Sequence, residues 1–292
     1  MSKNQQSFGL EIIMESKIHQ DGTPHLNVLF IGAGGIVFGN NNVKWNHSSR
    51  LEELLGRRLR VVGIVDPSRE RYEWVIERKQ KALAAECYAS TRHYGSIQQA
   101  AQDLAENTRN QYPDLILLAT PPDSRGTLLP GRDLEAQLIR EFGGKPSVFV
   151  EKPVSTARGS EPESVSKTLA KSGNPVAVGY MMRYLRVVQK AVQIIRENRL
   201  LVMNVSARYI TAYQRIRKFD WWDKEKQCGP IVEQATHFCD LCRYLGGEIV
   251  MDSVRAIALE HNEPAGKLSH QAVDESGIPA EKKIPRATSA FW

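Results

Sequence analysis

The chain has 292 residues, of which 41% are hydrophobic and 25% are charged. This composition is typical of a globular protein and excludes a disordered chain, a collagen-like chain and a small disulfide-stapled scaffold. The 39 lysines and arginines against 33 aspartates and glutamates give a net charge of +6. Because acidic and basic residues are mixed along the chain, they do not form the basic stripe of a nucleic-acid-binding protein, so we expect no nucleic acid partner.

The sequence predicts a cytoplasmic protein without a membrane anchor. No apolar run approaches the roughly 18 residues that a membrane helix needs, and the polar first 26 residues lack the apolar core of a signal peptide. We interpret residues 1–26 as an N-terminal extension. The four cysteines, at positions 87, 228, 239 and 242, are too few and too uneven in spacing for a disulfide framework, which favours a reducing compartment.

From residue 26 onward, short runs rich in Val, Ile and Leu alternate with longer charged runs of helical period. This alternation predicts α/β architecture, a Rossmann-type doubly wound parallel sheet with helices on its faces. The predicted strands are residues 27–31, 60–65, 115–119 and 147–150. The predicted helices between and around them are residues 48–58, 68–86, 96–107 and 131–142. Turns rich in Gly, Pro, Asp or Thr follow the strands, at the edge where such sheets bind ligands.

After Pro153 the pattern changes, and a second unit of α+β type is predicted. Its predicted helices are residues 163–172, 186–199 and 233–247, and its predicted strands are residues 175–182, 200–213 and 249–259. We therefore place a dinucleotide-binding domain over residues 27–155 and a short substrate or oligomerisation domain over residues 156–292. A polar tail begins at about residue 261, for which flexibility is one interpretation.

The first predicted strand runs into a glycine turn, in the sequence NVLFIGAGGIVFG. Gly32 permits a tight turn, and Gly34 lets a pyrophosphate approach backbone N–H groups, so we expect the dinucleotide to bind at Gly32, Gly34, Gly35 and Ile36. The third position of the fingerprint is Val37 instead of Gly or Ala, and its branched side chain needs extra room. A purely structural turn is the alternative.

The second predicted strand ends at Asp66, where a carboxylate can accept both hydroxyls of an adenosine ribose. Asp66 lies 31 residues beyond Gly35, more than the usual spacing of about 20, and an insertion around residues 40–50 accounts for the surplus. A helix cap is the alternative role for Asp66. Its carboxylate favours NAD, but Ser68 and Arg69 offer a site for a 2′-phosphate, so NADP stays open.

Three further stretches, together with the glycine turn, resemble the glucose-fructose oxidoreductase, inositol dehydrogenase and rhizopine-catabolism family. They are ILLATPPDSRG at residues 116–126, VFVEKPVS at 148–155 and CGPIVEQATHFCDLCRYLGG at 228–247. The most specific match is the Glu-Lys-Pro signature at Glu151, Lys152 and Pro153. The sequence departs from the family at Arg125, where a histidine is usual, and at Glu233, where an aspartate is commoner.

The resemblance implies an NAD(P)-dependent oxidoreductase in which Thr120, Pro121, Glu151 and Lys152 contact the cofactor. Lys152 would also stabilise charge on a substrate oxygen, as a partly desolvated ammonium can. Without the resemblance, a surface lysine at the end of a strand is the simpler interpretation.

The resemblance also makes His237 the acid or base that exchanges a proton with the reacting oxygen. Glu233 would orient His237 or bind a substrate hydroxyl. At about 100° per residue, these two side chains share a polar stripe with Asp240, and a solvated helix face is the alternative. The cysteines at 239 and 242 fall on the opposite, apolar side. No second cysteine pair exists to complete a zinc site, so we expect buried structural cysteines and no metal.

The resemblance implies substrate contacts at Arg183, Tyr184 and Asp240, and Trp222 is a further candidate. Arg183 could clamp an anionic or polyhydroxyl substrate or pair with a neighbouring acid. Trp222 belongs to a pair of consecutive aromatics, for which packing is the better interpretation, although one ring could also stack on a substrate.

The resemblance implies hydride transfer between a nicotinamide and a hydroxyl or carbonyl carbon of a sugar, a polyol or a similar small molecule. Two alternatives stay open: an inactive cofactor-binding or regulatory partner protein, and a non-redox enzyme that retains a bound cofactor. Family members usually continue past this length with a large open sheet. We therefore expect a shortened second domain with an unpaired sheet edge, and a homo-oligomer.

Overall fold

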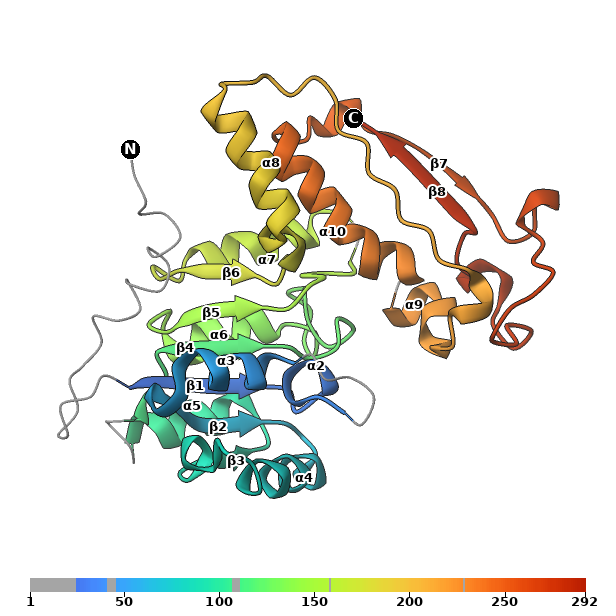
Figure 1. Cartoon of the computed structure of the whole chain (residues 1–292). Helices are drawn as coiled ribbons and strands as arrows, with labels where there is room; N and C mark the ends of the chain where they lie inside the picture. The colour runs from blue at the N-terminus through green and yellow to red at the C-terminus, as the bar shows by residue number, and fades with distance from the viewer. Residues whose placement is uncertain (1–24, 41–45, 107–110, 158, 228) are drawn as a thin grey trace. The chain divides into compact units, whose positions relative to one another are not determined.

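The computed structural model describes residues 25–40, 46–106, 111–157, 159–227 and 229–292 (Figure 1). The chain divides into two compact units, Met1–Gly179 and Tyr180–Trp292. Most of the predicted N-terminal extension and Cys228 lie outside the described residues.

The first unit is built on a six-stranded parallel sheet. Its strands are β1 (Leu26–Ile31), β2 (Leu59–Val65), β3 (Arg92–Tyr94), β4 (Leu115–Leu118), β5 (Ser147–Val150) and β6 (Val176–Val178). Their spatial order is β3-β2-β1-β4-β5-β6, and every neighbouring pair is parallel. This is the doubly wound order whose direction of winding reverses between β1 and β4, so the predicted fold class is confirmed.

Helices cover both faces of this sheet, as Figure 1 shows. They are α2 (Gly35–Phe38), α3 (His47–Leu55), α4 (Arg69–Gln80), α5 (Ile97–Glu106), α6 (Leu134–Phe142) and α7 (Glu161–Ala170). Apolar residues of α5, α6 and α7 pack on one face, and those of α2, α3 and α4 pack on the other. Strands buried on both faces have continuous apolar sequences, which explains why four of them are visible in the sequence.

Two strands differ from the sequence prediction. The three-residue β3 was not predicted, because Arg92, His93 and Tyr94 form no apolar run. The sequence predicts residues 176–178 in the second unit, whereas the structure pairs them with β5 as the sixth strand of the sheet. The first compact unit therefore extends to Gly179, beyond the predicted boundary near residue 155.

The second unit contains α8 (Arg186–Glu197), α9 (Lys224–Gln227), α10 (Gly229–Gly246), β7 (Arg255–Leu259) and β8 (Ala287–Phe291). The predicted strand over residues 200–213 is wrong: residues 200–212 form no regular element, and Figure 1 draws them as a thin connection after α8. The apolar composition was misleading, because a strand also needs a hydrogen-bonded neighbour. In the described part of the chain, no strand pairs with this segment.

The predicted strand over residues 249–259 is shorter than expected and forms β7 only at its end. It pairs antiparallel with β8, which lies inside the polar tail. The tail is therefore ordered at β8. Ile278 also packs with Trp222 and Ile216 in a small buried cluster of this unit. No helix within the described ranges is both long and apolar enough to cross a bilayer.

Candidate functional site

The carboxyl edge of the six-stranded sheet gathers the predicted cofactor residues of the first unit. The glycine turn follows β1, Asp66 follows β2, Thr120 follows β4, and Glu151 and Lys152 follow β5. These residues are separated by up to 120 positions in sequence, but parallel strands end at one edge of a sheet and bring them together.

The glycine turn has the geometry that its sequence predicts. Gly32 has φ +97°, and an added Cβ would lie 3.1 Å from the carbonyl oxygen of Ala119, so only glycine fits here. An added Cβ at Gly34 would meet nothing within 4 Å, so that side of the turn is open. Ile36 is exposed, whereas Val37 is completely buried in the core. The valine therefore points away from the open side and does not obstruct it.

Helix α2 has only four residues, so its dipole contributes little to an anion site. The N–H groups of Gly35 and Ile36 lie in its first turn, where no helical carbonyl accepts from them. Any binding of a diphosphate at this turn depends on these backbone donors.

Asp66 is held against the glycine turn by two backbone hydrogen bonds. The N–H of Ala33 donates to Oδ2 over 2.7 Å, and the N–H of Ser68 donates to Oδ1 over 2.9 Å. The cap of α4 is Ser68, whose hydroxyl accepts from the N–H of Arg71, so the helix-cap alternative for Asp66 is wrong. Since a carboxylate has about four acceptor positions, Asp66 keeps room for the two hydroxyls of a ribose.

Arg71 is hydrogen-bonded to the glycine turn, whereas the predicted Arg69 is paired elsewhere. Arg69 is exposed and pairs with Glu73 one helical turn away, 3.0 Å between Nε and Oε1. Arg71 instead donates from Nη2 to the carbonyl oxygen of Ala33 over 3.0 Å. Its position three residues after the Ser68 cap turns it back toward the start of the helix, a signal that the sequence contains.

Thr120 and Pro121 follow β4, next to the glycine turn. The Thr120 methyl would lie 3.2 Å from a Cβ at position 32. The Thr120 hydroxyl is buried and has no hydrogen-bond partner among the described residues. An unpaired buried hydroxyl is costly, so this position favours a further polar group. Pro121 is exposed.

Glu151 is buried and Lys152 is half-buried directly after β5. One carboxylate oxygen of Glu151 accepts from the N–H of Lys152 over 2.9 Å, and the other lies 2.7 Å from Nε2 of His47. His47 begins α3 and lies 104 residues before Glu151. Sequence reasoning missed this histidine, because nothing near it in sequence identifies its partner.

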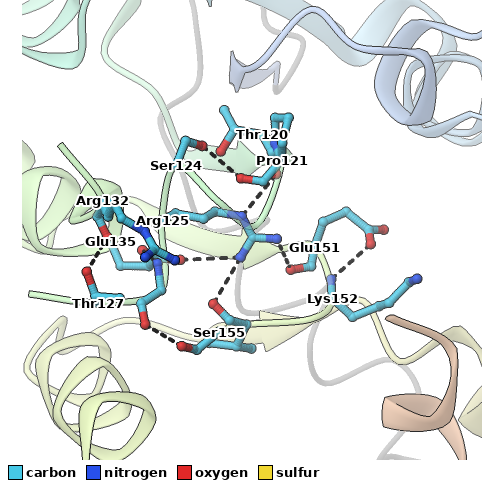
Figure 2. Close-up of polar contacts among 12 residues, drawn as sticks. Thr120, Pro121, Ser124, Arg125, Thr127, Arg132, Glu135, Glu151, Lys152 and Ser155 are labelled. Carbon is cyan, nitrogen blue, oxygen red and sulfur yellow. Dashed lines mark hydrogen bonds and ion pairs between the residues drawn. The ribbon is translucent and has the colours of Figure 1, made fainter. Parts of the chain in front are cut away.

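Arg125 is buried between the segments that follow β4 and β5 (Figure 2). It donates to the main-chain oxygens of Thr120, Glu151 and Val154 over 3.1, 2.6 and 3.2 Å. It also pairs with the buried Glu135 of α6, 3.3 Å between Nη1 and Oε1. Burial lowers the pKa of the Arg125 guanidinium, and the charge of Glu135 opposes that shift. The sequence marks Arg125 only as a departure from the family pattern.

In the second unit, His237 and Glu233 both lie on α10, where the sequence predicts a helix. His237 is buried, with its ring 6.3 Å from the ring of Tyr180. Nζ of Lys218 lies 3.5 Å from Oε2 of Glu233. Since His237 and Asp240 are both buried, the polar stripe of this helix is not a solvated face.

Arg183 and Asp240, both predicted substrate contacts, bind each other. The guanidinium donates from Nε to Oδ2 over 2.6 Å and from Nη2 to Oδ1 over 2.5 Å, and it lies on the ring of Tyr244. The hydrogen bonds to Asp240 raise the pKa of Arg183. The ion-pair interpretation of Arg183 is therefore confirmed. Tyr184 is 75% exposed.

Trp222 is completely buried and donates from its indole N–H to the carbonyl oxygen of Ile216 over 3.0 Å. The structure thus corrects its assignment as a substrate contact, because a fully packed ring has no free face. Cys242 is buried as expected, but Cys239 is exposed. Partial desolvation raises the pKa of both thiols. Within the described residues, no three His, Cys, Asp or Glu side chains are grouped to hold a metal ion.

Family models match both parts of the chain. The model of an oxidoreductase family with the NAD-binding Rossmann fold matches residues 26–180, and that of an oxidoreductase C terminal domain matches residues 183–292. Two uncharacterized proteins of Schizosaccharomyces pombe are 39% and 36% identical over 92% and 91% of the chain. The chain spans 66% and 68% of their lengths.

Solved structures give the same fold at low sequence identity. The WlbA dehydrogenase of Chromobacterium violaceum, crystallised with NADH and UDP-GlcNAcA, has a TM-score of 0.59 and 19% identity, over 92% of this chain and 63% of that one. The myo-inositol 2-dehydrogenase of Lactobacillus plantarum has a TM-score of 0.54 and 16% identity, over 83% and 62%. At these identities the likeness shows the fold alone.

Proposed function

Because the chain belongs to the oxidoreductase family with the NAD-binding Rossmann fold, we propose that it is a nicotinamide-dependent dehydrogenase or reductase. It acts on a carbon that bears a hydroxyl or a carbonyl, in a sugar, a polyol or a similar small molecule. The bound nicotinamide supplies the hydride chemistry, and the protein supplies orientation and charge.

One observation carries this proposal: the glycine turn, the Asp66 carboxylate and Lys152 lie at one edge of the sheet. The residues fit a dinucleotide, since Gly34 leaves open space at the turn and the Asp66 oxygens are oriented there by backbone N–H groups. Asp66 favours NAD over NADP. The 2′-phosphate on the adenosine ribose of NADP would be repelled by the negative charge of the Asp66 carboxylate.

Lys152 and His237 have different roles in the proposed reaction. The Lys152 ammonium donates a hydrogen bond to the reacting oxygen and stabilises negative charge on it. In the oxidation direction, His237 accepts the hydroxyl proton while the carbon–oxygen double bond forms, and in reduction it returns that proton. Glu233 orients His237 or binds a neighbouring substrate hydroxyl.

The first experiment titrates the protein with NADH and NADPH and then measures turnover on a panel of polyols and carbonyl compounds. We expect saturable binding, tighter for NADH, and turnover of at least one compound. K152M and H237N should each lower kcat about 100-fold or more, since general acid–base groups contribute about 10²–10⁴ in rate. H237N should also keep NADH affinity within a few-fold of the wild type, because His237 is assigned to the substrate and not to the cofactor. Absence of binding by either nucleotide at millimolar concentration contradicts the proposal.

The mutual pairing of Arg183 and Asp240 favours a second candidate, a cofactor-binding partner protein without turnover, because it occupies two predicted substrate contacts. This candidate predicts tight NADH binding with no activity on any compound of the panel. Turnover without a net change in added cofactor would indicate the non-redox alternative.

A further inference from the structure

The Arg125 side chain is hydrogen-bonded to two loops of the candidate site. It is 1% exposed, and Glu135 is fully buried. Its guanidinium holds the carbonyl of Thr120, after β4, and the carbonyls of Glu151 and Val154, after β5. The last two residues flank Lys152 and Pro153, so the main chain on both sides of the lysine is fixed to one rigid group.

The two loops also contact each other directly, at Gly126 after β4 and Ser155 after β5. The N–H of Gly126 donates to Oε2 of Glu135 over 2.9 Å, and the hydroxyl of Ser155 donates to the carbonyl of Gly126 over 2.5 Å. Gly126 has φ +80°, and an added Cβ would lie 2.4 Å from the carbonyl oxygen of Val154. The loops are therefore packed to contact, and Glu135 ties both Arg125 and Gly126 to α6.

Only arginine suits this arrangement. A guanidinium has five N–H donors in a rigid plane and no acceptor, so it can serve several carbonyls and a carboxylate at once. A lysine at position 125 would keep the positive charge beside Glu135 but lose the planar set of N–H donors. Figure 2 shows the Glu151 and Lys152 side chains extending away from the Arg125–Glu135 pair.

We propose that Arg125, held by Glu135, is a positioning residue that fixes Lys152 for contact with the nicotinamide half of the cofactor. This inference rests on the proposed function. Arg125 itself touches neither cofactor nor substrate. Arg125 positions Lys152 through the main chain at Glu151 and Val154. This positioning should be lost when either the Arg125 guanidinium or the Lys152 side chain is removed.

The test compares the affinities of the full-length protein for NADH and for ADP-ribose, which lacks the nicotinamide, measured by calorimetry. In the wild type we expect NADH to bind at least tenfold tighter. R125K and K152A should each reduce that ratio to about threefold or less, with ADP-ribose affinity changed no more than twofold. The double variant should be no worse than K152A alone, because residues that act through one another are not additive.

R132K is the matched control, since Arg132 lies in the same loop region and its Nη2 contacts the side-chain hydroxyl of Thr156 at 3.5 Å, outside the segment 151–154 that Arg125 holds. It should leave the ratio unchanged. S155A is a milder variant that removes one link between the loops, and it should lower the ratio about twofold to fivefold; it carries the test if R125K does not fold.

Three results overturn the inference alone. In the first, R125K and S155A keep the wild-type ratio, and in the second, R125K lowers NADH and ADP-ribose affinity equally. An additive double variant also overturns it. If the wild type binds neither NADH nor NADPH, the proposed function fails and the inference fails with it. These outcomes are distinguishable, because the first three require a wild type that binds NADH.

Discussion

At the scale of one residue, Asp66 is held by the local backbone in an orientation suited to the proposed ligand. Its carboxylate accepts from Ala33 in the glycine turn and from Ser68 ahead of α4, so it is oriented before any ligand arrives. A pre-oriented carboxylate loses little side-chain entropy on binding. The same two bonds also stabilise the loop, so a substitution there has a structural as well as a binding consequence.

We predict that D66A weakens NADH binding about 10- to 100-fold, because hydrogen bonds to a charged group contribute about 1.5–3 kcal/mol each and a tenfold change corresponds to about 1.4 kcal/mol. Fluorescence titration measures the affinity, and thermal unfolding reports the structural part. D123N, at an exposed position of another loop, is the control. Wild-type affinity in D66A would show that the ribose binds elsewhere.

At the scale of elements, His47 connects α3 to the end of β5. Its imidazole lies 2.7 Å from the Glu151 carboxylate, and its ring lies 5.2 Å from the ring of Phe149. Both side chains of the pair are nearly buried, 12% and 8% exposed. An interaction at such a site is costly to break, because the remaining partner stays away from water.

We predict that H47A lowers the free energy of unfolding by about 1–3 kcal/mol, the cost of leaving a buried polar group without its partner. H47Q keeps a donor and should recover part of the loss. Urea denaturation measures the difference, with H270A at an exposed position as the control. Equal stability of H47A and the wild type would mean that water replaces the imidazole at no cost.

At the scale of the whole molecule, the two units differ in how much apolar surface they bury. The first has a buried cluster on each face of its sheet, with 17 and 14 residues among those described. The buried cluster of the second unit has three: Ile216, Trp222 and Ile278. Several of its large apolar side chains are exposed, including Leu201, Met203 and Ile257. Since burial of apolar surface drives folding, the two units should differ in stability.

We predict that amide hydrogens of β1 and β4 exchange at least 100-fold more slowly than those of β7 and β8. The inner strands are hydrogen-bonded on both sides, whereas the described part of β7 and β8 forms a sheet of two strands with exposed side chains. Hydrogen-exchange mass spectrometry of the intact chain measures this, with β3 as an internal control at the edge of the first sheet. Equal protection of the two sheets would indicate that a partner or a second copy covers β7 and β8.

Local sequence patterns alone specify the order of most elements, the doubly wound fold and the edge of the sheet where the candidate site lies. Continuous apolar runs, glycine turns and the Glu-Lys-Pro signature are local patterns. Because the strands are parallel, the residues that follow them lie at one edge of the sheet. The tertiary structure decided what depends on neighbours distant in the chain. It joined residues 176–178 to the first sheet, left residues 200–212 without a strand partner, and completely buried Trp222. It also placed His47 on Glu151 and Arg125 across two loops, because a side chain's hydrogen-bond partners follow from packing and not from spacing in sequence.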